Sequence, residues 1–148
     1  TFMVASVMGA VITSTGILDV LAKNVLLKFI KNRTVLVFVT LVYCYVVNFL
    51  TAGRQTVSII VTEQTFESTY EDMNVSRKVL SRTLEDSGTL SAPIVPWGVA
   101  TIYVMGVLGC STAYIPYAWF IFVVPIFSMI CAITGIGIWD KEEKPVRK

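Results

Sequence analysis

The chain has 148 residues, of which 55% are hydrophobic and only 15% are charged, whereas soluble domains carry about 25% charged residues. This composition excludes an ordinary soluble domain and predicts an all-α, polytopic bundle of transmembrane helices. The net charge is only +2 and the basic residues are not interleaved with stacking aromatics, which excludes nucleic-acid binding. The sequence has no histidine and no metal-ligand spacing, so we expect neither an enzyme nor a cofactor.

Long uncharged stretches set the number of membrane passages. Residues 87–139 carry no charged side chain, and as a helix they would be roughly 80 Å long at about 1.5 Å per residue. Because a bilayer core is about 30 Å thick, this run must cross twice, with a reversal near Gly109 and Pro116. In chain order we predict five passages and a cytoplasmic tail, at about residues 1–22, 34–53, 55–72, 93–110, 116–139 and 140–148.

The third predicted passage, residues 55–72, is the least regular. Glu63, Glu67 and Glu71 recur every four residues and therefore share one helical face. Polar segments at membrane depth are tolerated only where they are buried in protein or face a watery cavity, so we predict a broken or re-entrant passage. A short passage followed by a solvated cytoplasmic helix is an equally good interpretation.

Basic residues orient the passages. By the excess of positive charge in cytoplasmic loops, the three basic clusters should all face the cytoplasm, with the N-terminus outside. These clusters are Lys23, Lys28, Lys31 and Arg33; then Arg77, Lys78 and Arg82; then Lys141, Lys144, Arg147 and Lys148. The one remaining basic residue, Arg54, would lie at the outer end. Because the sequence begins at Thr1 inside an apolar segment, we expect a piece of a longer protein.

Residues 80–97, LSRTLEDSGTLSAPIVPW, are the most informative segment, because they change abruptly from polar to apolar. A short helix would place Arg82 three and four residues before Glu85 and Asp86, at ion-pair spacing. Gly88 would end this helix as a left-handed cap.

Two prolines, Pro93 and Pro96, then prevent a regular helix. Backbone carbonyls freed there, together with nearby side-chain oxygens, would suit a small hard cation. Those side chains are Glu85, Asp86, Ser87 and Thr89. With no imidazole present, any proton carrier near neutral pH would be a carboxylate with a raised pKa. An amphipathic helix at the membrane surface explains the same residues without a site.

Residues 80–97 resemble the signature of the NhaC family of sodium/proton antiporters, some of whose relatives exchange organic acids. Residues 53–59, followed by Phe66 and Tyr70, and residues 114–120 are similar to two further family segments. The resemblance covers the whole chain but only about the final third of such a transporter. Two departures stand out. Arg54 replaces an expected acid, so that a fixed positive charge would repel Na⁺, and Gly98 replaces an expected Asn.

The resemblance implies one repeat of an inverted-repeat secondary transporter in the cell membrane, with broken helices that meet near mid-membrane. It implies Na⁺/H⁺ antiport by alternating access, with Asp86 as the exchange carboxylate and Glu85 as its alternative. The implied cation and proton site comprises Asn48, Thr51, Gln55 and Ser58 on one broken segment, and Thr83, Glu85, Asp86, Ser87 and Thr89 on the other.

Two other functions fit the same sequence. One is organic-acid exchange, such as malate for lactate, and the other is a non-transporting membrane fragment that acts as a packing partner. The partners expected for an antiporter are Na⁺, H⁺, the lipid bilayer, the N-terminal part of the transporter and, in an oligomer, further copies.

The predicted topology places Cys110 outside and the sequons at Asn32 and Asn74 inside. A membrane-impermeant thiol reagent applied to intact cells should therefore label Cys110. Glycosylation of Asn32 or Asn74 in a eukaryotic host would contradict this topology, because glycans are added only on the non-cytoplasmic side.

Overall fold

The computed structural model describes residues 11, 14, 30, 32–136 and 138. Every regular element among these residues is a helix, so the all-α prediction is confirmed for this part of the chain. Most of the expected first passage, residues 1–22, and the whole expected tail, residues 140–148, lie outside the described residues. The helices are α3, Arg33–Leu50; α4, Gln55–Asp72; α5, Arg77–Leu84; η3, Glu85–Thr89; η4, Ala92–Ile94; α6, Val99–Leu108; η5, Thr112–Tyr117; and α7, Trp119–Thr134.

Helix α3 has the length and composition of a membrane span. Its 18 residues carry no charge after Arg33 and extend about 27 Å at about 1.5 Å per residue, close to the bilayer core of about 30 Å. Within the described residues it is the one helix that is long and apolar enough to cross by itself. Phe38, Val42 and Val46 form an exposed stripe at four-residue spacing, and the opposite face packs against protein.

The chain breaks between α3 and α4. Ala52 and Gly53 both adopt left-handed backbone, with φ of 59° and 73°. The Gly53 N–H donates to the Asn48 carbonyl at 2.8 Å, which satisfies one backbone carbonyl at the end of α3. The interruption is therefore a turn that its own backbone hydrogen bond closes.

The expectation of a break inside residues 55–72 is corrected, because α4 is continuous over all of them and the break precedes it. The segment contains no Gly or Pro, the residues that interrupt helices most strongly. Its buried Thr62 hydroxyl donates to the Ser58 carbonyl at 2.6 Å, so this polar side chain is satisfied within the helix.

Helix α5 continues through the π-helical turn η3 and the 3-10 turn η4 before the chain breaks at residues 95–98. The helix of residues 77–94 and helix α6 are bent by 57° relative to one another. As the sequence predicts, two prolines mark this second break, Pro93 in η4 just before it and Pro96 within it. π-Helical turns are rare and occur frequently at functional sites.

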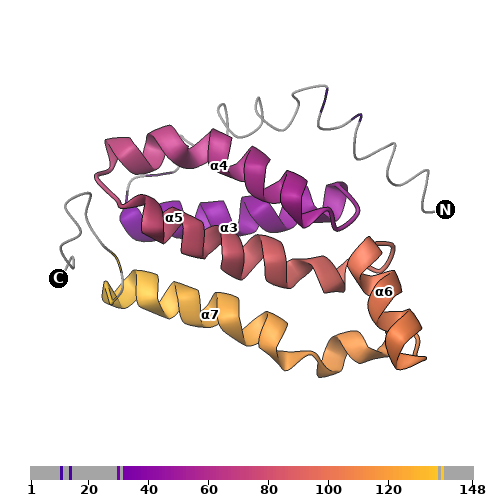
Figure 1. Cartoon of the computed structure of the whole chain (residues 1–148). Coiled ribbons are helices and arrows are strands. Elements are labelled where there is room, and N and C mark those ends of the chain that lie inside the picture. The colour runs from indigo at the N-terminus through magenta and orange to yellow at the C-terminus, as the bar shows by residue number, and fades with distance from the viewer. Residues whose placement is uncertain (1–10, 12–13, 15–29, 31, 137, 139–148) are drawn as a thin grey trace.

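Residues 77–94 also differ from expectation in their position. One of the two interpretations of this segment placed a helix at the membrane surface before a passage over residues 93–110. Instead, residues 77–94 run alongside α3 and α4 for the length of the bundle, and α6 turns away at its far end (Figure 1). The physical reason is that Thr83, Ser87 and Ser91 are buried, so the polar face meets protein rather than lipid.

Gly88 is not the expected left-handed cap. Among the described glycines only Gly53, Gly109 and Gly135 have positive φ, and Gly88 lies inside η3. A Cβ atom on Gly88 would lie 2.7 Å from Cγ1 of Ile59 and 3.2 Å from Sγ of Cys44. Gly88 is therefore needed because α4 and α3 approach it closely, as small residues allow in membrane bundles.

The expected reversal near Gly109 is present. Gly109 ends α6 with a φ of 62°, and the 3-10 turn η5, with Pro116 inside it, leads into α7. Helix α7 is apolar but has only 16 residues.

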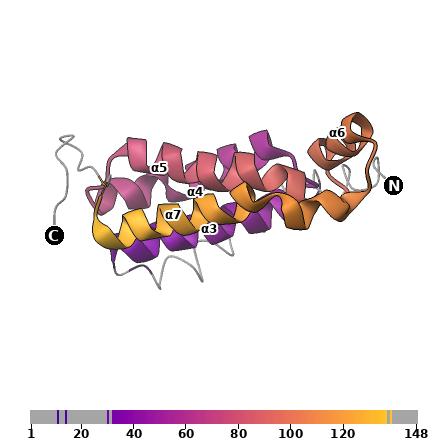
Figure 2. The same cartoon turned by 90° about the horizontal axis from the view of Figure 1, so that it is seen from below.

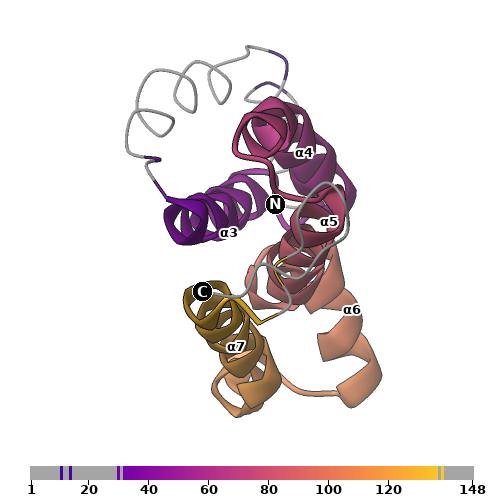
Figure 3. The same cartoon turned by 90° about the vertical axis from the view of Figure 1, so that its left-hand side faces the viewer.

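Helices α3, α4, α5 and α7 lie along one common direction, with α6 at one end (Figures 1 and 2). Seen end-on, α3, α4 and α5 form a three-helix cluster, and α7 packs against α3 and η3 (Figure 3). Leu36, Phe66, Tyr70 and Leu80 belong to the core between the helices. The start of α3, the α4–α5 connection and the end of α7 share one end of the bundle, and both breaks share the other (Figure 1).

Replacing Gly88 by Ala should lower the free energy of unfolding by about 1–3 kcal/mol, the usual range for overpacking. The added methyl group would overlap the side chain of Ile59, so a further Ile59→Ala change should recover part of the loss. Gly106→Ala is the matched control, because a Cβ there meets nothing within 4 Å. Thermal unfolding in detergent measures all three variants. Equal midpoints for Gly88→Ala and Gly106→Ala would contradict the close approach.

Candidate functional site

The two helix breaks pack directly against one another. A Cβ atom on Gly53 would lie 3.3 Å from the Ala92 carbonyl oxygen and 3.3 Å from Cα of Gly98. A Cβ atom on Gly98 would lie 3.2 Å from the Ala52 carbonyl oxygen. The contact is therefore backbone on backbone, and any side chain at residue 98 would push the breaks apart. Along the bundle this contact lies at the end of α3.

Both departures from the family pattern have structural consequences. Gly98 is buried between the breaks, and an Asn side chain would not fit there without movement of the neighbouring backbone. Arg54 is exposed, so its charge is not enclosed in the contact between the breaks.

Backbone carbonyls that the second break leaves without a helical partner accept hydrogen bonds from side-chain hydroxyls. The Thr101 hydroxyl donates to the carbonyl oxygens of Pro93 and Val95, at 2.9 Å and 2.6 Å. The Tyr114 hydroxyl also donates to the Pro93 carbonyl, at 2.6 Å. These carbonyls are therefore satisfied by side chains of the same chain.

Asn48 links α3 to the π-helical turn. Its side chain is 0% exposed, and Nδ2 donates to the Gly88 carbonyl at 3.0 Å and to Oγ of Ser91 at 2.6 Å. Its other amide atom, Oδ1, is buried and has no hydrogen-bond partner within the described part of the chain. Buried polar atoms are nearly always paired, so Oδ1 is an acceptor that the neighbouring side chains leave unused.

Small polar side chains continue from Asn48 along the interface of α3, α4 and η3. The hydroxyls of Ser87, Thr62 and Ser58 lie around the thiol of Cys44. All four of these side chains are fully buried. The middle of the three-helix cluster is therefore lined by neutral oxygen and sulfur atoms.

The two adjacent carboxylates of η3 face different sides, because successive helical residues are about 100° apart. Asp86 is 19% exposed and forms an ion pair with Arg82, at 3.7 Å between Oδ2 and Nε, as its four-residue spacing predicts. Glu85 instead lines a cavity of about 210 Å³ between α4 and α5. Both carboxylates lie at the middle of residues 77–94, and thus about halfway along the bundle.

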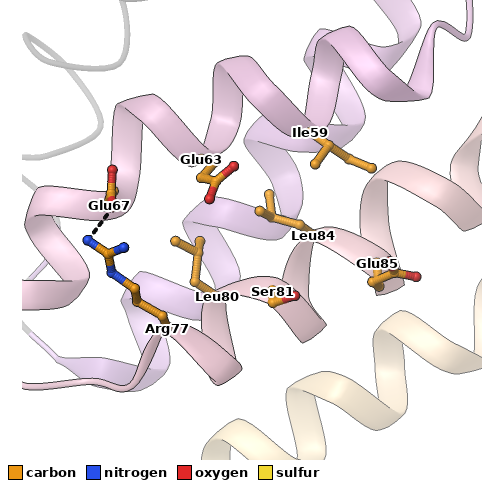
Figure 4. A pocket seen from close by; sticks show the side chains of 8 residues that line it. All are labelled: Ile59, Glu63, Glu67, Arg77, Leu80, Ser81, Leu84 and Glu85. Atoms are coloured by element: carbon orange, nitrogen blue, oxygen red, sulfur yellow. Dashed lines mark ion pairs between the residues drawn. The ribbon is translucent and has the colours of Figure 1, made fainter. Parts of the chain in front are cut away.

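The cavity beside Glu85 is lined by both charged and apolar side chains. Glu63 and Glu67 of α4 face it across from Arg77 and Glu85 (Figure 4). Arg77 forms ion pairs with Glu67 and Glu71 at the predicted cytoplasmic end. Glu63 is exposed and Glu67 is partly exposed, so the acidic side of this cavity lies at the surface of the described part of the chain.

The structure brings together only some of the nine expected site residues. Five of them are buried between the helices: Asn48, Thr51, Ser58, Thr83 and Ser87. Glu85 instead lines the cavity between α4 and α5, and Asp86 forms the ion pair with Arg82. Gln55 is exposed and Thr89 is half-buried, so neither belongs to the buried group.

Sequence reasoning missed three buried side chains at this interface, Cys44, Thr62 and Ser91. The spacing of small polar residues along the sequence could have identified these side chains. Small polar residues recur at four-residue intervals on all three helices, as Thr40, Cys44 and Asn48; as Ser58 and Thr62; and as Thr83, Ser87 and Ser91. Such spacing puts each set on one helical face.

A helix of spanning length, two interrupted segments in contact and a pair of carboxylates halfway along the bundle are typical of helical membrane transporters. Comparison with known proteins makes this specific. The chain belongs to the Na⁺/H⁺ antiporter family, whose profile matches residues 1–136.

Individual relatives agree with the family. The chain is 38% identical over 147 residues to the Na(+)/H(+) antiporter NhaC of Alkalihalophilus pseudofirmus, a match that covers 99% of this chain and 31% of that protein. It is 36% identical over 129 residues to the Na(+)/H(+) antiporter NhaC of Bacillus subtilis, covering 86% of this chain and 28% of that protein. A malate-2H(+)/Na(+)-lactate antiporter of Bacillus subtilis is 32% identical over 140 residues, covering 94% of this chain and 30% of that protein.

The chain thus spans less than a third of the length of these curated relatives. No solved structure matches it significantly.

Proposed function

We propose that the complete protein exchanges Na⁺ for H⁺ across the cell membrane by alternating access, and that this chain supplies one repeat of its transport unit. One observation carries the proposal: Glu85 and Asp86 lie halfway along a helix that runs the length of the bundle, at a π-helical turn. Ionisable residues at membrane depth are costly, and where they occur they mark ion pathways. The two NhaC relatives, each named a Na(+)/H(+) antiporter, support the same function.

The proposed topology keeps five passages. Four of them correspond to α3, α4, the bent pair of residues 77–94 with α6, and α7, and residues 1–22 form the fifth. The end that holds the start of α3 and the α4–α5 connection faces the cytoplasm, because Arg33, Arg77 and Lys78 gather there. The breaks, with Arg54, lie toward the outside.

In this proposal Asp86 is the carboxylate at which Na⁺ and H⁺ compete, and Glu85 is the alternative carrier. Arg82 pairs with Asp86 when no ion is bound and is displaced when Na⁺ or H⁺ neutralises the carboxylate. The cavity lined by Glu63, Glu67 and Glu85 provides the cytoplasmic route, since its acids concentrate cations.

A second candidate is organic-acid exchange. The malate-2H(+)/Na(+)-lactate antiporter is 32% identical to this chain, and the exposed Arg54 at the first break could bind a carboxylate through its guanidinium group. The third candidate is a membrane fragment that only packs against other proteins. It predicts no transport at all.

Everted membrane vesicles that carry the complete gene product separate these functions. Added Na⁺ should discharge a pre-formed pH gradient, as reported by a pH-sensitive dye. Discharge only by malate or lactate would favour the second candidate. A gradient that responds to none of them would leave the packing function.

Asp86→Asn should abolish discharge by Na⁺ at an unchanged level of protein in the membrane, because the amide cannot exchange a proton. Asp72→Asn is the matched control, since Asp72 is an exposed acid at the end of α4, and its activity should be that of the wild type. A lower protein level with unaltered Na⁺ dependence of the remaining activity would show that Asp86 serves only as the partner of Arg82.

A further inference from the structure

The outer face of α4 is polar, whereas the outer faces of α3 and α7 are apolar. Gln64 and Ser68 lie four residues apart, on one face of the helix, and both are exposed, as is the neighbouring Glu63. The exposed side chains in the middle of α3 are Val42 and Val46, and α7 exposes aliphatic and aromatic side chains. The surface of the described bundle therefore divides into a polar side and an apolar side.

Contacts between α4 and α3 give the depth of the polar side. The ring of Phe66 packs edge to face against that of Tyr43, with centroids 5.3 Å apart. The Tyr70 hydroxyl donates to Oγ1 of Thr40 at 3.4 Å. Tyr43 and Thr40 belong to the middle of α3, the helix of spanning length. Gln64 precedes Phe66 by only two residues, so it lies close to mid-membrane when α3 spans the bilayer.

Lipid does not suit this polar side. Charged and amide side chains at membrane depth are costly unless they face protein or a watery cavity. Within the described part of the chain, neither Glu63 nor Glu85 forms an ion pair. The surface that covers them should therefore be polar and should supply hydrogen-bond donors.

The length of the relatives indicates what covers the polar side. The chain matches 31% of the antiporter of Alkalihalophilus pseudofirmus and 28% of that of Bacillus subtilis, so about two-thirds or more of such a transporter lies outside the matched region. That part has to pack against these helices somewhere. The apolar sides of α3 and α7 are satisfied by lipid tails, which are as apolar as leucine side chains, whereas the polar side of α4 needs a protein partner.

We propose that the outer face of α4, with Glu63, Gln64 and Ser68 at its centre, is the docking surface for the part of the transporter that lies outside these 148 residues. The apolar sides of α3 and α7 then face lipid. The docked part covers the exposed acidic side of the cavity between α4 and α5 and presents donors or a basic side chain to Glu63. This inference rests on the membrane topology of the proposed function, but not on which ion is exchanged.

Photo-cross-linking in the complete protein tests the docking surface without any transport measurement. p-Benzoylphenylalanine, which on illumination joins to a nearby C–H carbon, replaces Gln64 in one variant and Val42 in another. Residue 64 should become joined to a peptide from outside these 148 residues, which mass spectrometry of the digested protein identifies. Residue 42, at the same depth on α3, should give phospholipid adducts and no joined peptide.

Several results at residue 64 would overturn the proposal. Phospholipid adducts would show that this face meets lipid, and an unreacted ketone would show that it meets water. A joined peptide from within these 148 residues, or from a second copy in protein assembled from light and heavy isotopes, would show a different occupant. The expected cross-link in a protein that fails to exchange Na⁺ for H⁺ would instead refute the proposed function and leave the docking surface standing.

A smaller probe applies if the benzophenone disrupts assembly. In a protein whose native cysteines are replaced by Ser, a nitroxide spin label is attached at Gln64→Cys or at Val42→Cys. The label at residue 64 should be poorly accessible both to oxygen, which concentrates in lipid, and to a water-soluble nickel chelate, because protein covers it. The label at residue 42 should be accessible to oxygen. High accessibility of residue 64 to either reagent would contradict the docking surface.

Discussion

The contact between the two helix breaks is the constraint on which the rest of the structure depends. Backbone meets backbone there, with Gly53 and Gly98 on opposite sides, and this is possible only where neither residue carries a side chain. The contact sets the distance between α3 and residues 77–94 at one end of the bundle. Further along, Gly88 allows the same close approach to Cys44 and Ile59.

Because interrupted helices free backbone groups that lipid cannot satisfy, the breaks must be closed by the protein itself. The Asn48 carbonyl accepts from Gly53 N–H, while Thr101 and Tyr114 donate to the carbonyls of the second break. Among the described residues, Asn48 Oδ1 is a buried side-chain acceptor that has no hydrogen-bond partner. The structure thus separates the breaks, which hold the helices together, from the buried polar interface and the two carboxylates further along the bundle.

Much of this arrangement could be predicted from the sequence. The uncharged runs predict helices in a membrane, the prolines predict the second break, and the four-residue spacing of Arg82 and Asp86 predicts their ion pair. The role of Gly88 could not be predicted, because a glycine at a close helix contact looks like a glycine at a cap until the neighbouring helix is placed. The position of residues 77–94 beside α3 and α4 was not predicted by the interpretation of this segment as a surface helix. A segment with charged residues appears solvated in sequence, whereas here its small polar face is buried against protein. The four-residue spacing of Thr83, Ser87 and Ser91 carried that information.

Thiol cross-linking between the end of α3 and the second break tests this contact most directly. The rings of Phe49 and Trp97 lie edge to face there, with centroids 4.6 Å apart, and both side chains reach the surface. In a protein whose native cysteines are replaced by Ser, a short reagent that reacts with two thiols should join Phe49→Cys to Trp97→Cys in membranes. A protease site placed in the α4–α5 connection makes the cross-link visible, because the two fragments then stay joined. Phe38→Cys paired with Trp97→Cys should remain separable, since Phe38 is also exposed on α3 but lies about 16 Å nearer its start, at about 1.5 Å per residue. Separable fragments from the Phe49→Cys and Trp97→Cys pair as well would contradict the packing of the two breaks.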